Sequence, residues 1–123
     1  MLEVDDVKAT ATFYVDRLGF TATDFIDNGD GTWAWCNVRR GAVAFMFSAR
    51  HTHEDDPEAD HVHPAEPILT GSLYVNVDDV DALAAELAGK VILDFGPADQ
   101  PHGMREIGVT DPNGYFLLFG QPC

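Results

Sequence analysis

The chain has 123 residues, the size of one ordinary domain, and is long enough to bury a core without disulfide bonds. Its 21 acidic and 7 basic side chains give a net charge of −14, which argues against nucleic acid or an anionic membrane as a partner. The two cysteines form no framework and no stretch resembles a signal peptide or a membrane span, so we expect a cytoplasmic protein whose acidic surface serves solubility or, alternatively, a high-salt cytoplasm.

The first fifty residues predict one helix followed by three strands. Asp5 or Asp6 can cap a helix that runs to Arg17 and stops at Gly19. An apolar run around Leu2 precedes this helix and predicts a short strand. The later strands are predicted over residues 20–26, 33–38 and 42–47, with turns at 28–31 and 39–41.

Residues 51–70 differ in composition from the segments on either side. They are acidic and rich in proline, which is typical of a solvated linker. They also contain two His-x-His pairs, formed by His51, His53, His61 and His63. Such pairs can share a metal ion on an extended segment. Because an unordered segment must be fixed first, a linker that binds metal loosely or not at all is the simpler interpretation.

The second half predicts the same order of elements as the first. Asp78 or Asp79 can cap a helix that ends at Gly89. A hairpin turns at residues 111–114, where proline and glycine suit a β-turn. The predicted strands cover residues 73–77, 90–95, 106–110 and 115–119.

A repeat at an offset of 73 residues relates the two halves. The tetrapeptide Val-Asp-Asp-Val occurs at residues 4–7 and 77–80, and the same offset places Gly41 on Gly114 and Phe45 on Leu118 without a gap. We therefore predict two βαβββ modules that share one core. Module one covers residues 1–50, the linker 51–70 and module two 71–123.

Two motifs resemble those of the vicinal oxygen chelate superfamily. They are Phe-Tyr-Val-Asp-Arg-Leu-Gly-Phe at residues 13–20 and Asp-Pro-Asn-Gly at residues 111–114. The superfamily includes glyoxalase I, extradiol dioxygenases and the fosfomycin- and bleomycin-resistance proteins. The resemblance implies an α+β fold in which two tandem βαβββ modules form a U-shaped mixed β-sheet cup with flanking helices, usually completed by a partner subunit.

In the enzymes of this superfamily, a divalent metal sits on the cup floor, held by the first and last strands of each module. Here the first of these positions would lie about one residue before Met1, and the others fall on Phe45, Ser72 and Leu118. Two apolar side chains and a hydroxyl cannot replace the hydration shell of a divalent cation. We therefore expect no metal and no cofactor at this place.

Alternation along the strands predicts a cup face with aromatic walls and a few polar groups. The expected ligand-binding residues are Trp33, Trp35, Phe45, Phe47, Ser72, Tyr74, Asn76, Glu106, Phe116 and Leu118. This lining suits a planar or amphipathic organic ligand, with Glu106 attracting a cationic group. The alternative is that the aromatic residues pack in the core and that Glu106 is a solvated or arginine-paired carboxylate.

The resemblance to the metal-independent bleomycin-resistance type implies sequestration of a cationic organic molecule at a dimer interface, without chemistry. We accordingly predict a homodimeric binding protein with a small-molecule partner and no assigned catalytic residue. The alternative is an enzyme of the same superfamily, a lyase, isomerase or dioxygenase. Such an enzyme would use an unusual metal set drawn from the linker histidines, or would use Glu106 as a general base.

Overall fold

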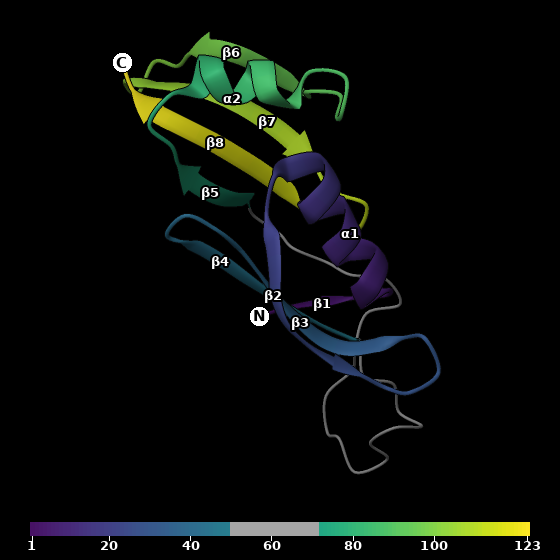
Figure 1. Cartoon of the computed structure of the whole chain (residues 1–123). Coiled ribbons are helices and arrows are strands. Elements are labelled where there is room, and N and C mark those ends of the chain that lie inside the picture. The colour runs from purple at the N-terminus through teal and green to yellow at the C-terminus, as the bar shows by residue number, and fades with distance from the viewer. Residues whose placement is uncertain (50–71) are drawn as a thin grey trace.

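The computed structural model describes residues 1–49 and 72–123, which form two helices and eight strands arranged in two four-stranded sheets (Figure 1). The elements are β1 (Leu2–Val4), α1 (Val7–Leu18), β2 (Thr21–Asp27), β3 (Trp33–Arg40), β4 (Val43–Ala49), β5 (Ser72–Asn76), α2 (Val80–Leu87), β6 (Phe95–Asp99), β7 (Met104–Thr110) and β8 (Phe116–Pro122). The predicted α+β fold of tandem βαβββ modules is confirmed. The linker histidines lie outside the described residues. Neither helix is long and apolar enough to cross a membrane within these two ranges.

Each helix begins at the second aspartate of the repeated tetrapeptide. The Asp6 carboxylate accepts a hydrogen bond from the Ala9 amide at 2.9 Å, and Asp79 accepts one from Ala82 at 3.0 Å. These bonds satisfy amide groups that have no partner inside the first turn. Helix α1 ends where Gly19 adopts a left-handed conformation at φ 76°, which glycine reaches without steric cost.

The two sheets have the same topology. The first sheet has the strand order β1-β4-β3-β2 and the second has the order β5-β8-β7-β6. In each, the opening strand runs parallel to the last strand and the other pairs are antiparallel. Helix α1 packs on β3 and β4, and α2 packs on the second sheet. We call the covered side of each sheet its helix-facing side and the opposite side its bare face.

The last strands of the two modules are offset by 72 residues and not by 73. Leu2 and Val75 are equivalent in the repeat, and they pair with Phe47 and Phe119. The gapless superposition of the hairpins is therefore wrong. The preceding strands are already offset by 71 residues, because Cys36 pairs with Phe47 and Ile107 pairs with Phe119. The chain between α2 and β7 is thus two residues shorter than that between α1 and β3, and the β7–β8 turn restores one of them. A slip of one residue moves every following side chain to the other face.

This slip places Phe45 and Phe47 on the helix-facing side, which corrects their predicted place on the cup floor. Their ring centroids lie 5.8 and 4.8 Å from that of Tyr14 on α1. Phe45 also stacks on Phe20 at 5.6 Å. Both rings therefore pack in the core, and Met46 takes the bare-face position between them.

A buried polar network joins α1 to the β7–β8 turn of module two. The Asp111 carboxylate accepts hydrogen bonds from the Tyr14 hydroxyl and from the amides of Asn113 and Tyr115, each at 2.9 Å. The Tyr115 hydroxyl donates to the carbonyl of Glu3 in β1. Burial and the neighbouring Asp111 carboxylate raise the pKa of Tyr14. The two modules thus share one core, as their half-domain length requires.

The strand predicted over residues 90–95 is wrong, because β6 begins only at Phe95. The amides of Lys90 and Val91 both bond to the Leu87 carbonyl. Since these donors are used to close the end of α2, they cannot join a strand ladder. The side chain of Ile92 is 91% exposed as a result.

Candidate ligand-binding site

The bare face of the second sheet brings together six of the predicted site residues. Strand pairing sets Tyr74 beside Leu118, Ser72 beside Phe116 and Asn76 beside Gly120, and Glu106 follows on the next strand. The side chains on this face are Ser72, Tyr74, Asn76, Phe95, Glu106, Phe116 and Leu118. Alternation along β5, β7 and β8 predicted all of these except Phe95.

Two glycines let aromatic rings lie directly on this face. A Cβ atom at Gly120 would lie 2.0 Å from the Tyr74 hydroxyl oxygen. A Cβ atom at Gly108 would lie 2.6 Å from the Phe95 ring and 2.9 Å from that of Phe116. Glycine within a strand often marks such a close approach. Gly108 and Gly120 are therefore the sequence signal from which the position of these rings could have been predicted. The rings form an aromatic floor against which a planar molecule can stack.

Glu106 is a nearly buried carboxylate at the centre of this floor. It is 4% exposed, and its partners are the Tyr74 hydroxyl, which reaches it across Gly120, and His102 Nε2 at 3.1 Å. The Tyr74 hydrogen bond, helped by His102, holds the pKa of Glu106 below its ordinary value although burial opposes this. Partial burial and the same hydrogen bond raise the pKa of Tyr74 to about 12. Glu106 is therefore negatively charged at neutral pH.

No arginine within residues 1–49 and 72–123 pairs with this carboxylate, which argues against an arginine-paired Glu106. Its neighbour Arg105 bonds to Asp81 through two nitrogens at 3.0 Å each and to Asp99 at 2.9 Å. Those hydrogen bonds, and after them the attraction of the two carboxylates, raise the pKa of Arg105. The guanidinium of Arg105 is thus bound to α2 and β6 and does not compete with a ligand cation for Glu106.

The bare face of the first sheet combines apolar and polar side chains. It carries Trp35, Asn37, Met46 and Ser48, which pair across β3 and β4. Ile26 of β2 lies beside Trp35. Ile26 is 56% and Met46 is 42% exposed. No described helix packs on this face, so the apolar side chains of Ile26 and Met46 are left uncovered by the described residues.

Trp33 does not lie on this face, because a β-bulge interrupts the alternation between Trp33 and Trp35. The prediction that the two side chains share a face is therefore wrong. Ile26 pairs with Trp35 but the next residue, Asp27, pairs with Trp33, so Ala34 is the extra residue. The Trp33 ring instead stacks on Phe25, with centroids 4.4 Å apart. The bulge thus turns Trp33 toward α1.

The positions that hold a metal in enzymes of the superfamily do not fit a divalent cation here. With the corrected register, these positions are Met46, Ser72 and Leu118, which offer a thioether, a hydroxyl and a hydrocarbon. Hard cations need oxygen ligands and borderline ones need imidazole or thiolate. Residues 1–49 and 72–123 also contain no cluster of three or more His, Cys, Asp or Glu side chains that could hold a metal ion. No reaction step through a metal can be derived from these residues.

Two tandem βαβββ modules, each with its helix on one side of a four-stranded mixed sheet and a bare face on the other, define the class of fold. The chain belongs to the Glyoxalase/Bleomycin resistance protein/Dioxygenase superfamily, whose family model matches residues 1–119. A search of the curated proteins gave no match.

Several solved structures are similar to this chain. The bleomycin-binding protein of bleomycin-producing Streptomyces verticillus, complexed with copper(II)-bleomycin, is 33% identical over 96% of this chain and 88% of its own, with a TM-score of 0.63. A bleomycin-binding protein complexed with bleomycin shares the fold at a TM-score of 0.70, with 24% identity over 99% and 94% of the two chains. TnmS3, an antibiotic-binding protein from Streptomyces sp. CB03234, gives 0.67, with 24% identity over 99% and 93%.

Proposed function

We propose that this protein binds and sequesters a planar organic cation on the bare face of its second sheet, without catalysing a reaction. The observation that carries this proposal is the charged Glu106 side chain, 4% exposed, set in an aromatic floor. A cation pairs with a carboxylate more strongly when water is largely excluded. The rings of Phe95, Phe116 and Tyr74 supply faces for the planar part.

The charge of the whole chain favours the same ligand class. A net charge of −14 raises the local concentration of cations around the protein, an effect that salt weakens. The similarity to a bleomycin-binding protein at 33% identity supports an antibiotic or another cationic metabolite as the ligand.

The pKa of Glu106 favours binding over the catalytic alternative. A general base that works near neutral pH needs a pKa raised toward 7. The hydroxyl of Tyr74 instead lowers that of Glu106, so the carboxylate holds a cation well and abstracts a proton poorly. This supports a binding protein rather than a lyase, isomerase or dioxygenase.

A second copy of the chain completes the site in this proposal. Ile26, Met46 and Tyr74 are between 42% and 56% exposed, and all three lie on bare faces. Uncovered apolar faces of this kind mark association surfaces. We therefore propose a homodimer, which acts in the cytoplasm, where free thiols such as those of Cys36 and Cys123 persist. Light scattering at micromolar concentration should give the dimer mass, and a monomer would contradict this part.

Bleomycin, with and without copper, is the first probe for the proposal. Calorimetry should detect binding to the wild-type protein, and mass spectrometry should recover the antibiotic unchanged. Asp16→Asn removes one exposed charge from α1 and should bind like the wild type, which controls for the contribution of net charge. Chemical conversion of the antibiotic, or a stoichiometric metal ion that survives dialysis of the protein alone, would overturn the binding function.

A further inference from the structure

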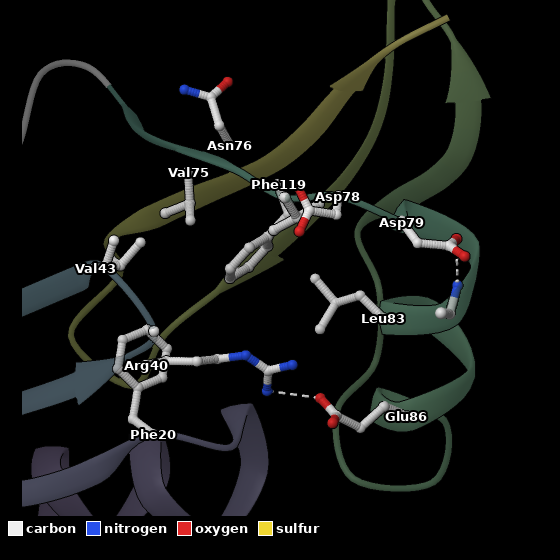
Figure 2. Close-up of a pocket in the computed structure, with 14 residues that line it drawn as sticks. Phe20, Arg40, Val43, Val75, Asn76, Asp78, Asp79, Leu83, Glu86 and Phe119 are labelled. Carbon is white, nitrogen blue, oxygen red and sulfur yellow. Dashed lines mark hydrogen bonds and ion pairs between the residues drawn. The ribbon is translucent and has the colours of Figure 1, made fainter.

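A concavity of about 500 Å³ lies between the two modules, and Asn76 at the end of β5 is the residue that it shares with the bare face of the second sheet (Figure 2). Its apolar walls come from the helix-facing sides of both modules, with Phe20 and Val43 on one side and Val75, Leu83 and Phe119 on the other. The volume falls within the range of small-molecule sites, about 300–1,000 Å³. The bare-face site uses none of these side chains.

An ion pair bridges the modules at the rim of this inter-module pocket. Arg40 Nη1 donates to the Leu18 carbonyl at 2.8 Å and to Glu86 at 2.6 Å. Figure 2 shows this guanidinium reaching from the first module toward α2. The Arg40 side chain passes over Gly19, where a Cβ atom would lie 2.2 Å from Nη1. The positive charge of Arg40 is therefore already compensated, and an anionic ligand would gain little from it.

One of the three carboxylates that line the pocket has no hydrogen-bond or ion-pair partner among the described residues. Glu86 is paired with Arg40, and Asp79 caps α2 through the Ala82 amide. Asp78 makes no hydrogen bond or ion pair with the described residues, and it lines the pocket in Figure 2. An open concavity with an apolar wall and an unpartnered carboxylate at its edge complements a molecule that is apolar at one end and positively charged at the other.

We propose that the inter-module pocket is a second ligand site, which binds a small hydrophobic amine. The ammonium group pairs with Asp78, and the hydrocarbon part packs against Val43, Leu83 and Phe119. Burial of the hydrocarbon supplies most of the affinity. The exposed ion pair supplies selectivity over an uncharged analogue, about fivefold at most. A ligand of the same shape that carries a carboxylate in place of the ammonium group is repelled by Asp78. This site is independent of the function proposed for the bare face.

Methyl-resolved NMR with three matched probes tests this proposal. Phenethylamine, 2-phenylethanol and 3-phenylpropanoate share an aromatic ring and differ in charge. Millimolar phenethylamine should shift the methyl signals of Val43, Val75 and Leu83, with the alcohol weaker by about threefold to fivefold and the acid weaker still. Asp78→Asn should abolish the preference for the amine over the alcohol while the remaining signals stay in place, because Asp78 is exposed.

A pair of alanine variants on α2 provides the steric control. Ala82 lines the pocket whereas Ala85 does not, and both are exposed. Ala82→Phe should block the methyl shifts, and Ala85→Phe should leave them unchanged. Shifts confined to the bare-face methyls of Met46 and Leu118, equal binding of amine and acid, or no shift with any probe would each overturn the proposal.

Discussion

Asp111 and Glu106 are the two acidic side chains that are buried in the described part of the chain, each 4% exposed, and they are held in different ways. Asp111 accepts from two backbone amides and from the buried Tyr14 hydroxyl. Glu106 is held by two side chains that can move, since Tyr74 is 42% exposed and the His102 side chain is 58% exposed.

The difference indicates that Asp111 stabilises the fold, whereas Glu106 is available to a ligand. Backbone amides can release Asp111 only if the β7–β8 turn opens, so its charge is satisfied permanently. The partners of Glu106 can swing toward solvent and admit a ligand cation. Equal burial therefore accompanies opposite roles, which measurements of stability and of ligand binding can separate.

Removal of Asp111 should have the largest effect on stability. Asp111→Ala leaves the Tyr14 hydroxyl and two amides without their acceptor, so we expect a loss of about 3–5 kcal/mol in the free energy of unfolding. Urea denaturation measures this loss, with Asp16→Ala on the exposed face of α1 as a control expected within about 0.5 kcal/mol. A loss below about 1 kcal/mol for Asp111→Ala would show that this network does not join the modules.

Glu106→Gln should change the unfolding free energy far less, by about 1 kcal/mol or less, because the amide oxygen still accepts from Tyr74. The lowered pKa of Glu106 means that its charge stabilises the fold above the unfolded value, about 4.3, and that this contribution disappears as pH falls through the lower folded value. Urea denaturation of both proteins at pH 7, 5 and 3 should therefore show any wild-type advantage at pH 7 and 5 and its decline toward pH 3. An advantage that grows on acidification would contradict the assigned direction.

The ionisation of Tyr74 gives a spectroscopic measure of the same hydrogen bond. Its pKa is raised to about 12, so the bond stabilises the fold below the ordinary tyrosine value, about 10, and is lost as pH rises through 12. Ultraviolet titration should place one tyrosine near pH 12 in the wild type and lower in Glu106→Gln. Identical titration curves would mean that Glu106 does not hold Tyr74.

The smallest expected effects on stability come from substitution of the two glycines beneath the aromatic floor. Gly120→Ala should push the Tyr74 ring outward and break its bond to Glu106, with a small loss of stability because the displaced ring is exposed. Gly108→Ala is the matched change, since it displaces Phe95 and Phe116 and leaves Tyr74 in place. Only Gly120→Ala should lower the pKa of Tyr74. If Gly108→Ala lowered it equally, the two halves of the floor would be coupled.

Local patterns predicted much of the fold and most of the second bare face. Paired aspartates and glycine stops located both helices, and alternation gave the correct face for Tyr74, Asn76 and Glu106. These features depend on neighbours in the chain, so the sequence displays them directly.

The first bare face was predicted less well, because its orientation depends on pairing between strands. A difference in connection length between the modules places Phe45 and Phe47 in the core, and a bulge at Ala34 turns Trp33 away from Trp35. Neither event leaves a periodic signal, because each inserts or removes one residue relative to the repeat. The hydrogen bond between Tyr74 and Glu106 was equally hidden, since the two residues lie on β5 and β7, far apart in the chain.

Titration of a planar aromatic cation into the wild-type protein and Glu106→Gln tests the central claim most directly. Proflavine followed by calorimetry at pH 7 and low salt suits this purpose, with Asp16→Asn controlling for the lost charge. We predict that the wild type and Asp16→Asn bind alike and that Glu106→Gln binds at least about tenfold more weakly, as expected for loss of a charged hydrogen-bond partner. Equal affinity of all three proteins would contradict the claim that Glu106 holds the ligand.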